Sequence, residues 1–358
     1  MLSNQFAALL APFKMLCNKN ALAITYRCLE LHGKMIRGAA RFGMMEVHGE
    51  FGIPEGPPIY VDGMTFLAII GSLPSEEEVE LNLEDKGVLA WQCGAARGRI
   101  ALMSIPEMPS IKRGNKNELA WVPTGEFIDV LKLGMLSCGN ESLASIGAYG
   151  VVLDNTNDLC VYSSDNVTIA AAYMSSEARI QGPDIMTFSP DSLNLLAAVI
   201  DTTNDKAKLE FDDQGIYYRD GTRRCVIKQI APLKVDINSI CAQYASSEIM
   251  VEIPTARVQA FLKRISAMAE TKKSTSLFIG ASKGKLNLSF SDGLASSEEY
   301  YLVDELNVPD LPLIELDGAK LGRALAHTSH VVLDYIDRHV LLLQGGDPIF
   351  QYIISGKL

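Results

Sequence analysis

A divergent internal repeat runs along this chain, and it limits the possible folds more than any single motif does. Residues 121–132 and 252–263 both contain Pro-Thr followed by Leu-Lys, at a constant offset of 131 residues. A second set of openings, at Asp62, Ser189 and Asp317, is spaced by 127 and then 128 residues. Each opening precedes an apolar helix-like run and then a strand-like run. The spacing therefore predicts one structural module that occurs several times.

Apolar residues at i, i+3, i+4 and i+7 predict the helices of this module, and residues 258–265 carry one complete stripe. Six short amphipathic helices are expected, at residues 4–16, 64–73, 125–137, 189–201, 255–270 and 318–327. Runs that alternate between apolar and polar residues lie between them, as in residues 286–290. Such alternation predicts antiparallel strands.

Six copies of a strand–helix–strands module, taken in pairs, predict three domains. We expect these domains at residues 1–117, 118–246 and 247–358, because the stretches 111–117 and 236–247 resemble linkers. One helix for several strands indicates an α+β fold, with the helices gathered on one face of each antiparallel sheet.

Composition and charge exclude several classes of protein. With 48% apolar and 21% charged residues the chain is typical of globular proteins, and its longest uncharged apolar stretch, residues 64–73, is too short to cross a membrane. The N-terminus lacks the pattern of a signal peptide. Seven scattered cysteines favour a reducing cytoplasm without disulfides or a zinc site. We therefore expect a cytoplasmic protein.

The formal net charge of −11 argues against an outer surface that coats nucleic acid. However, the six predicted helices sum to +2, which leaves −13 for the rest of the chain. Solvated lysines on polar helix faces account for this asymmetry as well as a phosphate-facing helical surface does. Charge alone leaves both interpretations open.

Four stretches carry a resemblance to a known family. Residues 66–85 are similar to a first-domain helix followed by Leu-Pro, an acidic turn and a strand, and residues 97–106 to the strand that follows. Residues 163–170 resemble a second-domain Ala-Thr-Asp-Gly-x-Arg-Leu-Ala motif, and residues 352–358 a closing Val-Val-Met-Pro-Met-Arg-Leu. In this order and spacing, the chain resembles the bacterial-type DNA polymerase sliding clamp, the β subunit.

The resemblance implies a head-to-tail homodimeric ring of six similar domains, lined by twelve helices and threaded by duplex DNA. Such a ring tethers the replicative polymerase, binds the clamp-loader ATPase, and needs neither catalysis nor a cofactor. At the seam between the two chains, the family's ion pairs fall on Arg97 and Arg99 of the first domain and on Glu298 and Glu299 of the third.

The resemblance also implies two binding regions. The residues expected to face DNA are Lys14, Lys19, Lys132, Tyr149, Lys263, Arg264, Lys320 and Arg323. The wall of a partner-peptide pocket between the second and third domains falls on Ala148, Val167, Thr168, Ile169, Val340, Tyr352, Ile354, Ser355, Gly356 and Leu358. Val167-Thr168 and Ser355-Gly356 depart from the family pattern, as expected of a virus-encoded clamp with partners of its own.

Motifs for an enzyme are weak. Residues 280–286 imitate a phosphate-binding loop but lack the Ser or Thr after Lys, so a hairpin turn is favoured. His327 and His330 lack a third metal ligand nearby in sequence. A nuclease-like set, Asp154, Asp158 and Asp165, is better explained by turns. Two alternatives stay open: a Mg²⁺-dependent nucleic-acid hydrolase that works through carboxylates, and a β-rich viral structural protein that binds no DNA.

Overall fold

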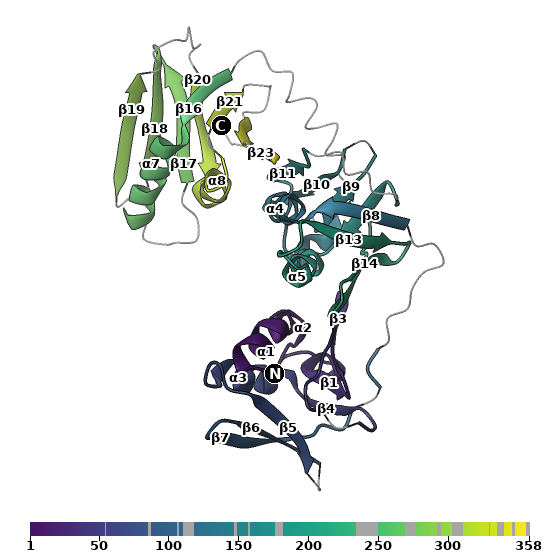
Figure 1. Ribbon diagram of the computed structural model, residues 1–358. Coiled ribbons are helices and arrows are strands. Elements are labelled where there is room, and N and C mark those ends of the chain that lie inside the picture. Colours follow the sequence, from purple (N-terminus) through teal and green to yellow (C-terminus); the bar gives the residue numbers. More distant parts are fainter. Residues whose placement is uncertain are drawn as a thin grey trace. The chain divides into compact units, whose positions relative to one another are not determined.

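The computed structural model describes most of the chain (Figure 1), which divides into two compact units. Unit 1 comprises Met1–Gly125 and Ala178–Ile230, and unit 2 comprises Glu126–Glu177 and Ala231–Leu358. The predicted linkers lie outside the described residues, so the boundaries of the three domains stay predictions. The described residues are 1–53, 55–84, 87–105, 107–109, 118–146, 149–156, 158–175, 182–233, 250–268, 276–291, 295–302, 311–328, 330–334, 340–345 and 348–355.

Unit 1 contains helices and strands from two stretches of the chain. Its helices are α1 (Ser3–Leu10), α2 (Phe13–Leu16), α3 (Gly63–Ser72), α5 (Pro190–Val199) and the short 3₁₀ helix η1 (Ile24–Arg27). Its strands are β1 (Cys28–His32), β2 (Met35–Ala40), β3 (Gly43–His48), β4 (Ile59–Asp62), β5 (Val79–Glu84), β6 (Val88–Cys93), β7 (Ala96–Ala101), β8 (Glu118–Pro123), β12 (Ile185–Phe188), β13 (Lys206–Phe211), β14 (Gly215–Arg219) and β15 (Arg223–Lys228).

Unit 2 holds the remaining elements. Its helices are α4 (Thr124–Gly134), which starts at the end of unit 1, η2 (Glu141–Ile146), α7 (Thr255–Met268) and α8 (Gly318–Leu325). Its strands are β9 (Val151–Asp154), β10 (Cys160–Ser164), β11 (Thr168–Tyr173), β16 (Met250–Pro254), β17 (Ser276–Ser282), β18 (Lys285–Ser291), β19 (Ser296–Leu302), β20 (Leu311–Asp317), β21 (His330–Asp334), β22 (Val340–Gly345) and β23 (Ile349–Ser355).

The order of these elements confirms the predicted repeat. Strand, helix and three further strands follow one another from β4, β8, β12, β16 and β20, and the first module lacks only the leading strand, which an isolated bridge at Leu2 replaces. The second set of repeat openings consists of helix N-caps. The side chains of Asp62, Ser189 and Asp317 accept hydrogen bonds from Thr65 N, Ser192 N and Ala319 N at 2.9, 3.2 and 2.9 Å.

One helix prediction is wrong in part. Residues 4–16 were expected to form one helix, but α1 ends at Leu10 and α2 starts at Phe13. Pro12 lies between them, and because proline has no backbone N–H it cannot extend the helical hydrogen bonding. Phe6, Leu10 and Phe13 are nevertheless buried, so the predicted apolar stripe is kept across the break.

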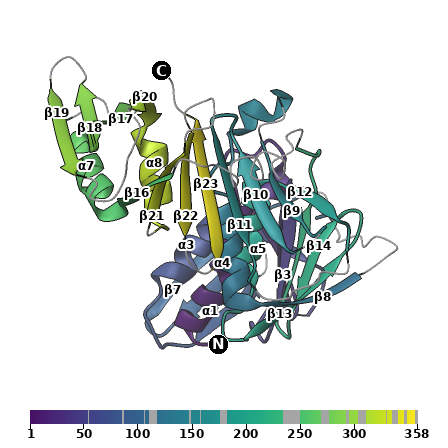
Figure 2. The ribbon, with the colours of Figure 1, turned by 90° about the horizontal axis from the view of Figure 1, so that it is seen from above.

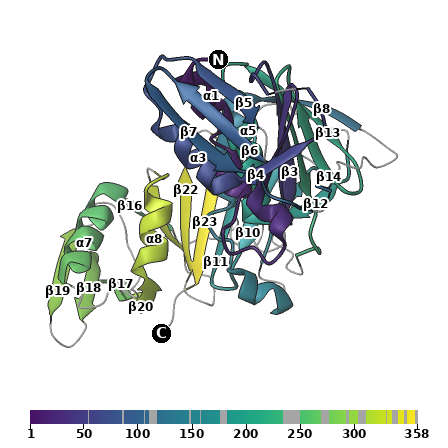
Figure 3. The ribbon, with the colours of Figure 1, turned by 90° about the horizontal axis from the view of Figure 1, so that it is seen from below.

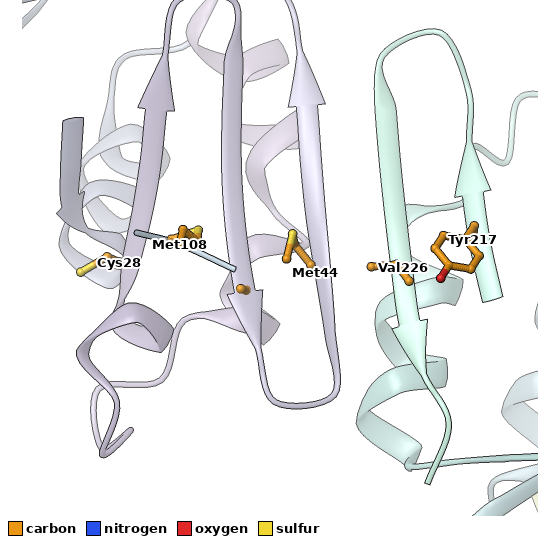
Figure 4. Packing of buried hydrophobic residues seen from close by; sticks show 6 residues of the cluster. Cys28, Met44, Met108, Tyr217 and Val226 are labelled. Carbon is orange, nitrogen blue, oxygen red and sulfur yellow. The ribbon is translucent and has the colours of Figure 1, made fainter. Parts of the chain in front are cut away.

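Unit 1 is built on an eight-stranded sheet in the order β4-β1-β2-β3-β15-β14-β13-β8, and β5, β6 and β7 form a separate sheet. One face of the large sheet is buried by helices. The opposite face, here called the outer face, carries an apolar cluster that includes Met44, Tyr217, Val226 and Met108 (Figure 4). The pairing of β3 with β15 thus joins segments about 180 residues apart in sequence into one layer.

Unit 2 has the same organisation. In Figure 2, β10, β11, β23, β22 and β21 lie side by side, in the order that the hydrogen bonds give. A second sheet has the order β19-β18-β17-β20, and α7 lies over β18 and β19 (Figure 3). The apolar stripe predicted on α7 is buried, from Val258 to Ile265. Antiparallel strands with helices on one face confirm the predicted α+β class within each unit.

Among the described helices, none has the length and apolar character that crossing a membrane requires. The described cysteines are free thiols, and all except Cys138 are buried.

Candidate functional site

The strongest concentration of positive charge on the described helices lies on α7 and α8. These helices pack together, with Gln259 Nε2 donating to Leu325 O at 2.7 Å. Neither helix contains an Asp or Glu, whereas α4 and α5 both do. The basic residues of the pair are Arg257, Lys263, Arg264, Lys320 and Arg323. The pair therefore presents a cationic surface to anionic ligands such as phosphate.

Three of the predicted DNA-facing side chains on this helix pair are exposed: Lys263, Arg264 and Arg323. Arg264 also pairs with Glu299 on β19, and its guanidinium carbon lies 5.8 Å from the centroid of the Phe261 ring. Arg264 and Glu299 were predicted for two different surfaces, and the structure brings them together. Lys263 and Arg323 are exposed and form no ion pair with other described residues.

The other predicted DNA-facing residues are spread over both units. Lys14 on α2 and Lys19 in the loop after it are exposed in unit 1. In unit 2, Lys132 is exposed at the end of α4, 3.9 Å from Asp129, and Tyr149 is half-buried before β9. These residues lie on elements other than α7 and α8, and the lysines among them are exposed.

Lys320 behaves differently, because an acidic turn holds it. Its Nζ lies 2.7 Å from Asp165 Oδ2, and only 19% of the Lys320 side chain and 14% of the Asp165 side chain are exposed. Asp165 belongs to the turn between β10 and β11, so the ion pair links that turn to α8. An ammonium group already paired and mostly covered is less available to an anionic ligand than the exposed Lys263.

The turn from Asp165 to Thr168 is tightly organised by the same carboxylate. Asp165 Oδ1 accepts hydrogen bonds from Val167 N, Thr168 N and Thr168 Oγ1 at 3.0, 2.7 and 2.9 Å. Burial acts to raise the pKa of Asp165, but the hydrogen bonds from Lys320 and from the turn outweigh it and lower that pKa. Asn166 has a φ of +69°, a conformation that Asn tolerates better than most residues.

The turn leads directly into the predicted peptide pocket. β11 pairs with β23, so Thr168 lies opposite Ile354, and Ser355 N donates to Val167 O at 2.9 Å. Val167 is exposed, Thr168 is buried and Ile169 is half-buried. On the neighbouring strand, Val340 pairs with Ser355. Ala148, Gly356 and Leu358 lie outside the described residues.

Tyr352 is the most deeply buried of the predicted pocket residues, with 0% of its surface exposed. Burial raises the pKa of its hydroxyl, and the nearby Thr168 and Ser137 hydroxyls act in the opposite direction. Neither Tyr352 Oη nor Ser137 Oγ has a hydrogen-bond partner of good geometry. Tyr352 therefore contributes to the core beneath this surface, and the exposed parts are Val167 and Ser355.

The predicted seam residues lie on two edge strands. Arg97 and Arg99 are on β7 and exposed, and Glu298 and Glu299 are on β19. Within the described part of the chain, β7 pairs only with β6 and β19 only with β18. Arg99 Nε donates to Glu84 Oε2 at 2.9 Å, and Glu298 Oε1 accepts from Tyr300 Oη at 2.5 Å.

A regularity in the sheets connects these two edges. The third strand of the first module, β3, pairs with that of the fourth, β15. The third strand of the third module, β11, pairs with that of the sixth, β23. Modules three apart thus join through their last strands. The last strands of the second and fifth modules are β7 and β19, and these two are left without such a partner among the described strands.

The sequence motifs that imitate enzymes have structural roles. Residues 280–286 form the predicted hairpin, whose turn residues Lys283 and Gly284 have φ values of +52° and +72°. Asp154 Oδ1 accepts from Thr156 N and Thr156 Oγ1 at 2.9 and 2.7 Å, as expected of a turn residue. No group of three His, Cys, Asp or Glu side chains in the described ranges is arranged to hold a metal ion.

Sequence reasoning missed the link between Lys320 and Asp165. The resemblance implies that Lys320 faces DNA, and the sequence offers Asp165 as a carboxylate ligand or a turn residue. The residues are 155 positions apart, and no local pattern joins them. A signal was nevertheless present for the turn itself, because Asp followed by Asn is typical of tight turns.

Comparison with solved structures identifies this architecture. The DNA polymerase III β subunit of Thermotoga maritima matches with a TM-score of 0.85 at 16% identity, over 100% of this chain and 98% of that chain. The corresponding subunit of Pseudomonas aeruginosa (TM-score 0.82, 14% identity) and the DNA polymerase sliding clamp of Bacillus subtilis (0.81, 12%) match over 100% of this chain and 98% of theirs. No protein-family model and no curated protein matches the sequence. The chain therefore has the sliding-clamp fold along its whole length, as the resemblance predicted.

Proposed function

We propose that this protein is a DNA sliding clamp, in which two copies close head to tail into a ring around duplex DNA and tether a polymerase without chemistry of their own. The observation that carries this proposal is the match to sliding clamps over the entire chain, at TM-scores of 0.81 to 0.85 for the three proteins above. The sixfold module and the cationic α7–α8 pair support it independently.

Ring closure follows from the pairing of modules three apart. Inside the chain this rule produces the β3–β15 and β11–β23 pairs. If the same rule acts between chains, β7 of one copy pairs with β19 of the next, and repeating the step with the second copy closes a two-chain ring. The edges carry opposite charge, with Arg97 and Arg99 on β7 and Glu298 and Glu299 on β19. Closure would also cover two edges that otherwise invite aggregation.

Contact with DNA would be weak and blind to sequence. Lysine and arginine side chains that reach phosphates hold a duplex without reading its bases, which permits sliding. Lys263 and Arg323 on α7–α8 would supply most of this contact, Arg264 less because Glu299 pairs with it, and Lys14, Lys19 and Lys132 would be further phosphate neighbours. Lys320 and Tyr149 would contribute less, because Asp165 holds Lys320 and Tyr149 is half-buried.

Partner proteins would bind at the surface formed by the Asp165–Thr168 turn and the end of β23. Val167 and Ser355 are exposed there and are joined by a backbone hydrogen bond. A short peptide from the polymerase or from the clamp-loader ATPase would lie across them. Such a clamp would act in the cytoplasm at the site of replication, including the host cytoplasm if a virus encodes it.

Retention on DNA of two topologies tests the proposal. The protein would be loaded with a clamp loader onto nicked circular DNA and onto the same DNA after linearisation, and bound protein would be separated by gel filtration. A topological ring stays on the circle and slides off the linear ends. Equal retention on both forms would show an ordinary DNA binder, and Mg²⁺-dependent cutting of the circle would show a hydrolase.

Charge reversal on α7 tests whether this helix contributes to retention on DNA. Lys263→Glu with Arg264→Glu should shorten retention on circles and flatten its salt dependence by about one unit of slope for each phosphate that is no longer neutralised. The matched control is Lys285→Glu, an exposed lysine on β18. If both proteins were retained like the wild type at low salt, α7 would not face DNA.

A further inference from the structure

The outer face of unit 1 ends in a group of aromatic, aliphatic and basic side chains on β8, β13 and β14. Here it is called the basic–aromatic patch, and it consists of Leu119, Trp121, Lys206, Lys208 and Arg219. We propose that the basic–aromatic patch is a docking surface for an acidic protein segment that carries an aromatic or aliphatic side chain. This surface is separate from the residues that the clamp function uses.

Strand geometry places an exposed tryptophan at the end of this sheet. Along β8, Ala120 and Val122 are buried, whereas Leu119 and Trp121 point to the outer face with 39% and 56% of their surfaces exposed. β8 is the last strand of the sheet among the described strands, next to β13 (Figure 1). Because large aromatic side chains bury more apolar surface than most residues, exposed ones often mark contact sites.

The strand register brings basic side chains beside this tryptophan. Lys208 lies directly opposite Trp121, and Lys206 lies opposite Pro123. On β14, Tyr218 pairs with Leu209, so Arg219 projects on the same face as Lys208. All three basic side chains are exposed. A ligand on Trp121 would thus have three cations within reach, beside one acid, Glu210, which is half-buried on the same face opposite Leu119.

The charge of the patch contrasts with the rest of the same outer face. At the other end, Arg37 pairs with Glu30 and Glu46, at 3.6 and 2.8 Å. Lys206, Lys208 and Arg219 form no ion pair within the described part of the chain. Since the whole chain carries −11, most of its surface repels acidic partners, and the patch is a local exception. Electrostatic steering would bring an acidic segment to this place.

The side-chain types favour a protein segment over single-stranded nucleic acid. Surfaces that bind single strands stack successive bases on several aromatic rings. Here one tryptophan is flanked on β8 by Leu119 and Pro123, which offer aliphatic contact and no stacking. A tryptophan surrounded by cations is typical of the energetic centre of a protein interface.

Fluorescence anisotropy with a labelled peptide tests the proposal on the full-length chain. The probe is a fluorescein-labelled peptide of sequence Asp-Glu-Phe-Glu-Ile-Asp, and a second probe replaces both apolar residues by Ser. We expect saturable binding of the first probe that weakens with salt, and weaker binding of the second. Trp121→Ala, and separately Lys206→Glu with Lys208→Glu, should each weaken binding by about tenfold or more. Lys285→Glu should leave the affinity within about twofold.

Several results would overturn the proposal. Absence of saturable binding to about 1 mM peptide by natively folded protein would do so. Equal affinity in wild type and both patch variants would also do so, and tighter binding of oligo(dT) than of the peptide at the same residues would assign the patch to nucleic acid. Retention of the patch variants on circular DNA provides a separate readout. If retention is normal while peptide binding is abolished, docking and encirclement are distinct properties.

Discussion

Two strand pairings inside this chain, β3 with β15 and β11 with β23, join modules three apart, and here each is called a joint. The side chains at the two joints differ. In unit 1, β3 joins β15, and on the outer face Glu46 lies opposite both Arg37 and Arg224, in a partly buried row of charges. In unit 2, β11 joins β23, and the small residues Ala170 and Ala172 lie opposite Tyr352 and Phe350. The outer face of the β3–β15 joint thus combines charge pairs with the apolar Met44–Val226 pair, whereas the β11–β23 joint matches small against large apolar side chains on its helix-facing side.

This difference indicates that backbone pairing determines which strands join, while the side chains determine how the stability of the joint depends on pH and salt. Both joints are antiparallel and continuous, although no residue type is shared between the paired positions above. An apolar joint should depend on packing, and an ionic joint on pH and salt. The proposed joint between β7 and β19 of two chains is ionic and exposed, so it should be the weakest of the three.

The largest expected effect is at the apolar joint. Phe350→Ala removes a ring that is 1% exposed, and it should lower the free energy of unfolding of unit 2 by about 3–5 kcal/mol. Hydrogen exchange followed by mass spectrometry would show faster exchange in β11 and β23. Met44→Ala is the counterpart in unit 1 and should loosen β3 and β15 instead. Equal acceleration in both units from either variant would show that the two joints do not act separately.

The next effect concerns two carboxylates whose pKa values shift in opposite directions. Asp165 in unit 2 has a lowered pKa, so its stabilising contribution is present above its unfolded pKa and is lost as pH falls through the folded value. Asp165→Asn should lower stability by about 2 kcal/mol at neutral pH, because a charged group with several hydrogen bonds is removed. The deficit should start to shrink in melts below about pH 4, where the aspartate of the unfolded chain takes up a proton before folded Asp165 does.

The pKa of Glu30 in unit 1 shifts in the opposite direction to that of Asp165. Burial raises its pKa despite the nearby Arg37, so the folded state binds the proton more tightly than the unfolded chain does. Its contribution is fully present below the unfolded pKa and is lost as pH rises through the folded value. Relative to Glu30→Gln, the wild type should therefore gain stability on mild acidification. Parallel pH profiles for the two variants would contradict the contrast between the joints.

The parts of the fold that could be predicted from sequence are those with a local signal. Helix stripes such as Val258 to Ile265, the N-caps Asp62 and Asp317, and the hairpin at Lys283-Gly284 depend on neighbours a few residues away. The joints depend on partners about 180 residues apart, and no periodicity records which strand edge meets which. The break at Pro12 had a local signal, but the continuous apolar stripe masked it.

In the candidate site, too, features with a local sequence signal could be predicted and those that depend on distant partners could not. Exposure of Lys263 and Arg323 follows from helix phase, so it could be predicted. The pairing of Lys320 with Asp165 and of Arg264 with Glu299 could not, because it depends on how a helix packs on a distant turn or strand. Long-range ion pairs change which cations are available to an anionic ligand, even where the helices themselves are correctly predicted.

A smaller effect is expected at the proposed joint between chains. Arg97 is exposed on β7, and Arg97→Glu should remove an exposed ion pair of about 1 kcal/mol at each of the two seams, which weakens dimerisation by about 25-fold in total. Sedimentation equilibrium at low and high salt would measure it, and the difference should vanish at high salt. Glu298→Arg in the same chain should restore the affinity. Arg219→Glu, on neither edge strand, is the matched control. If dimer affinity were the same in the wild type and in all these variants, the seam would lie elsewhere.

The smallest expected effect tests how the apolar joint accommodates a hydroxyl. Tyr352 Oη has no hydrogen-bond partner of good geometry, so Tyr352→Phe should change stability by less than about 0.5 kcal/mol at neutral pH, or raise it slightly. The matched control is Ser163→Ala, which removes a hydroxyl that donates to Gly134 O at 2.5 Å and should cost about 1 kcal/mol. Above about pH 10 the stabilities of the wild type and Tyr352→Phe should diverge, because unfolded tyrosine ionises before buried Tyr352 does. The wild type therefore loses stability there as pH rises, and Tyr352→Phe should lose less. A large loss in Tyr352→Phe at neutral pH would mean that the hydroxyl is bonded, and the β11–β23 joint would then depend on a polar contact as the β3–β15 joint does.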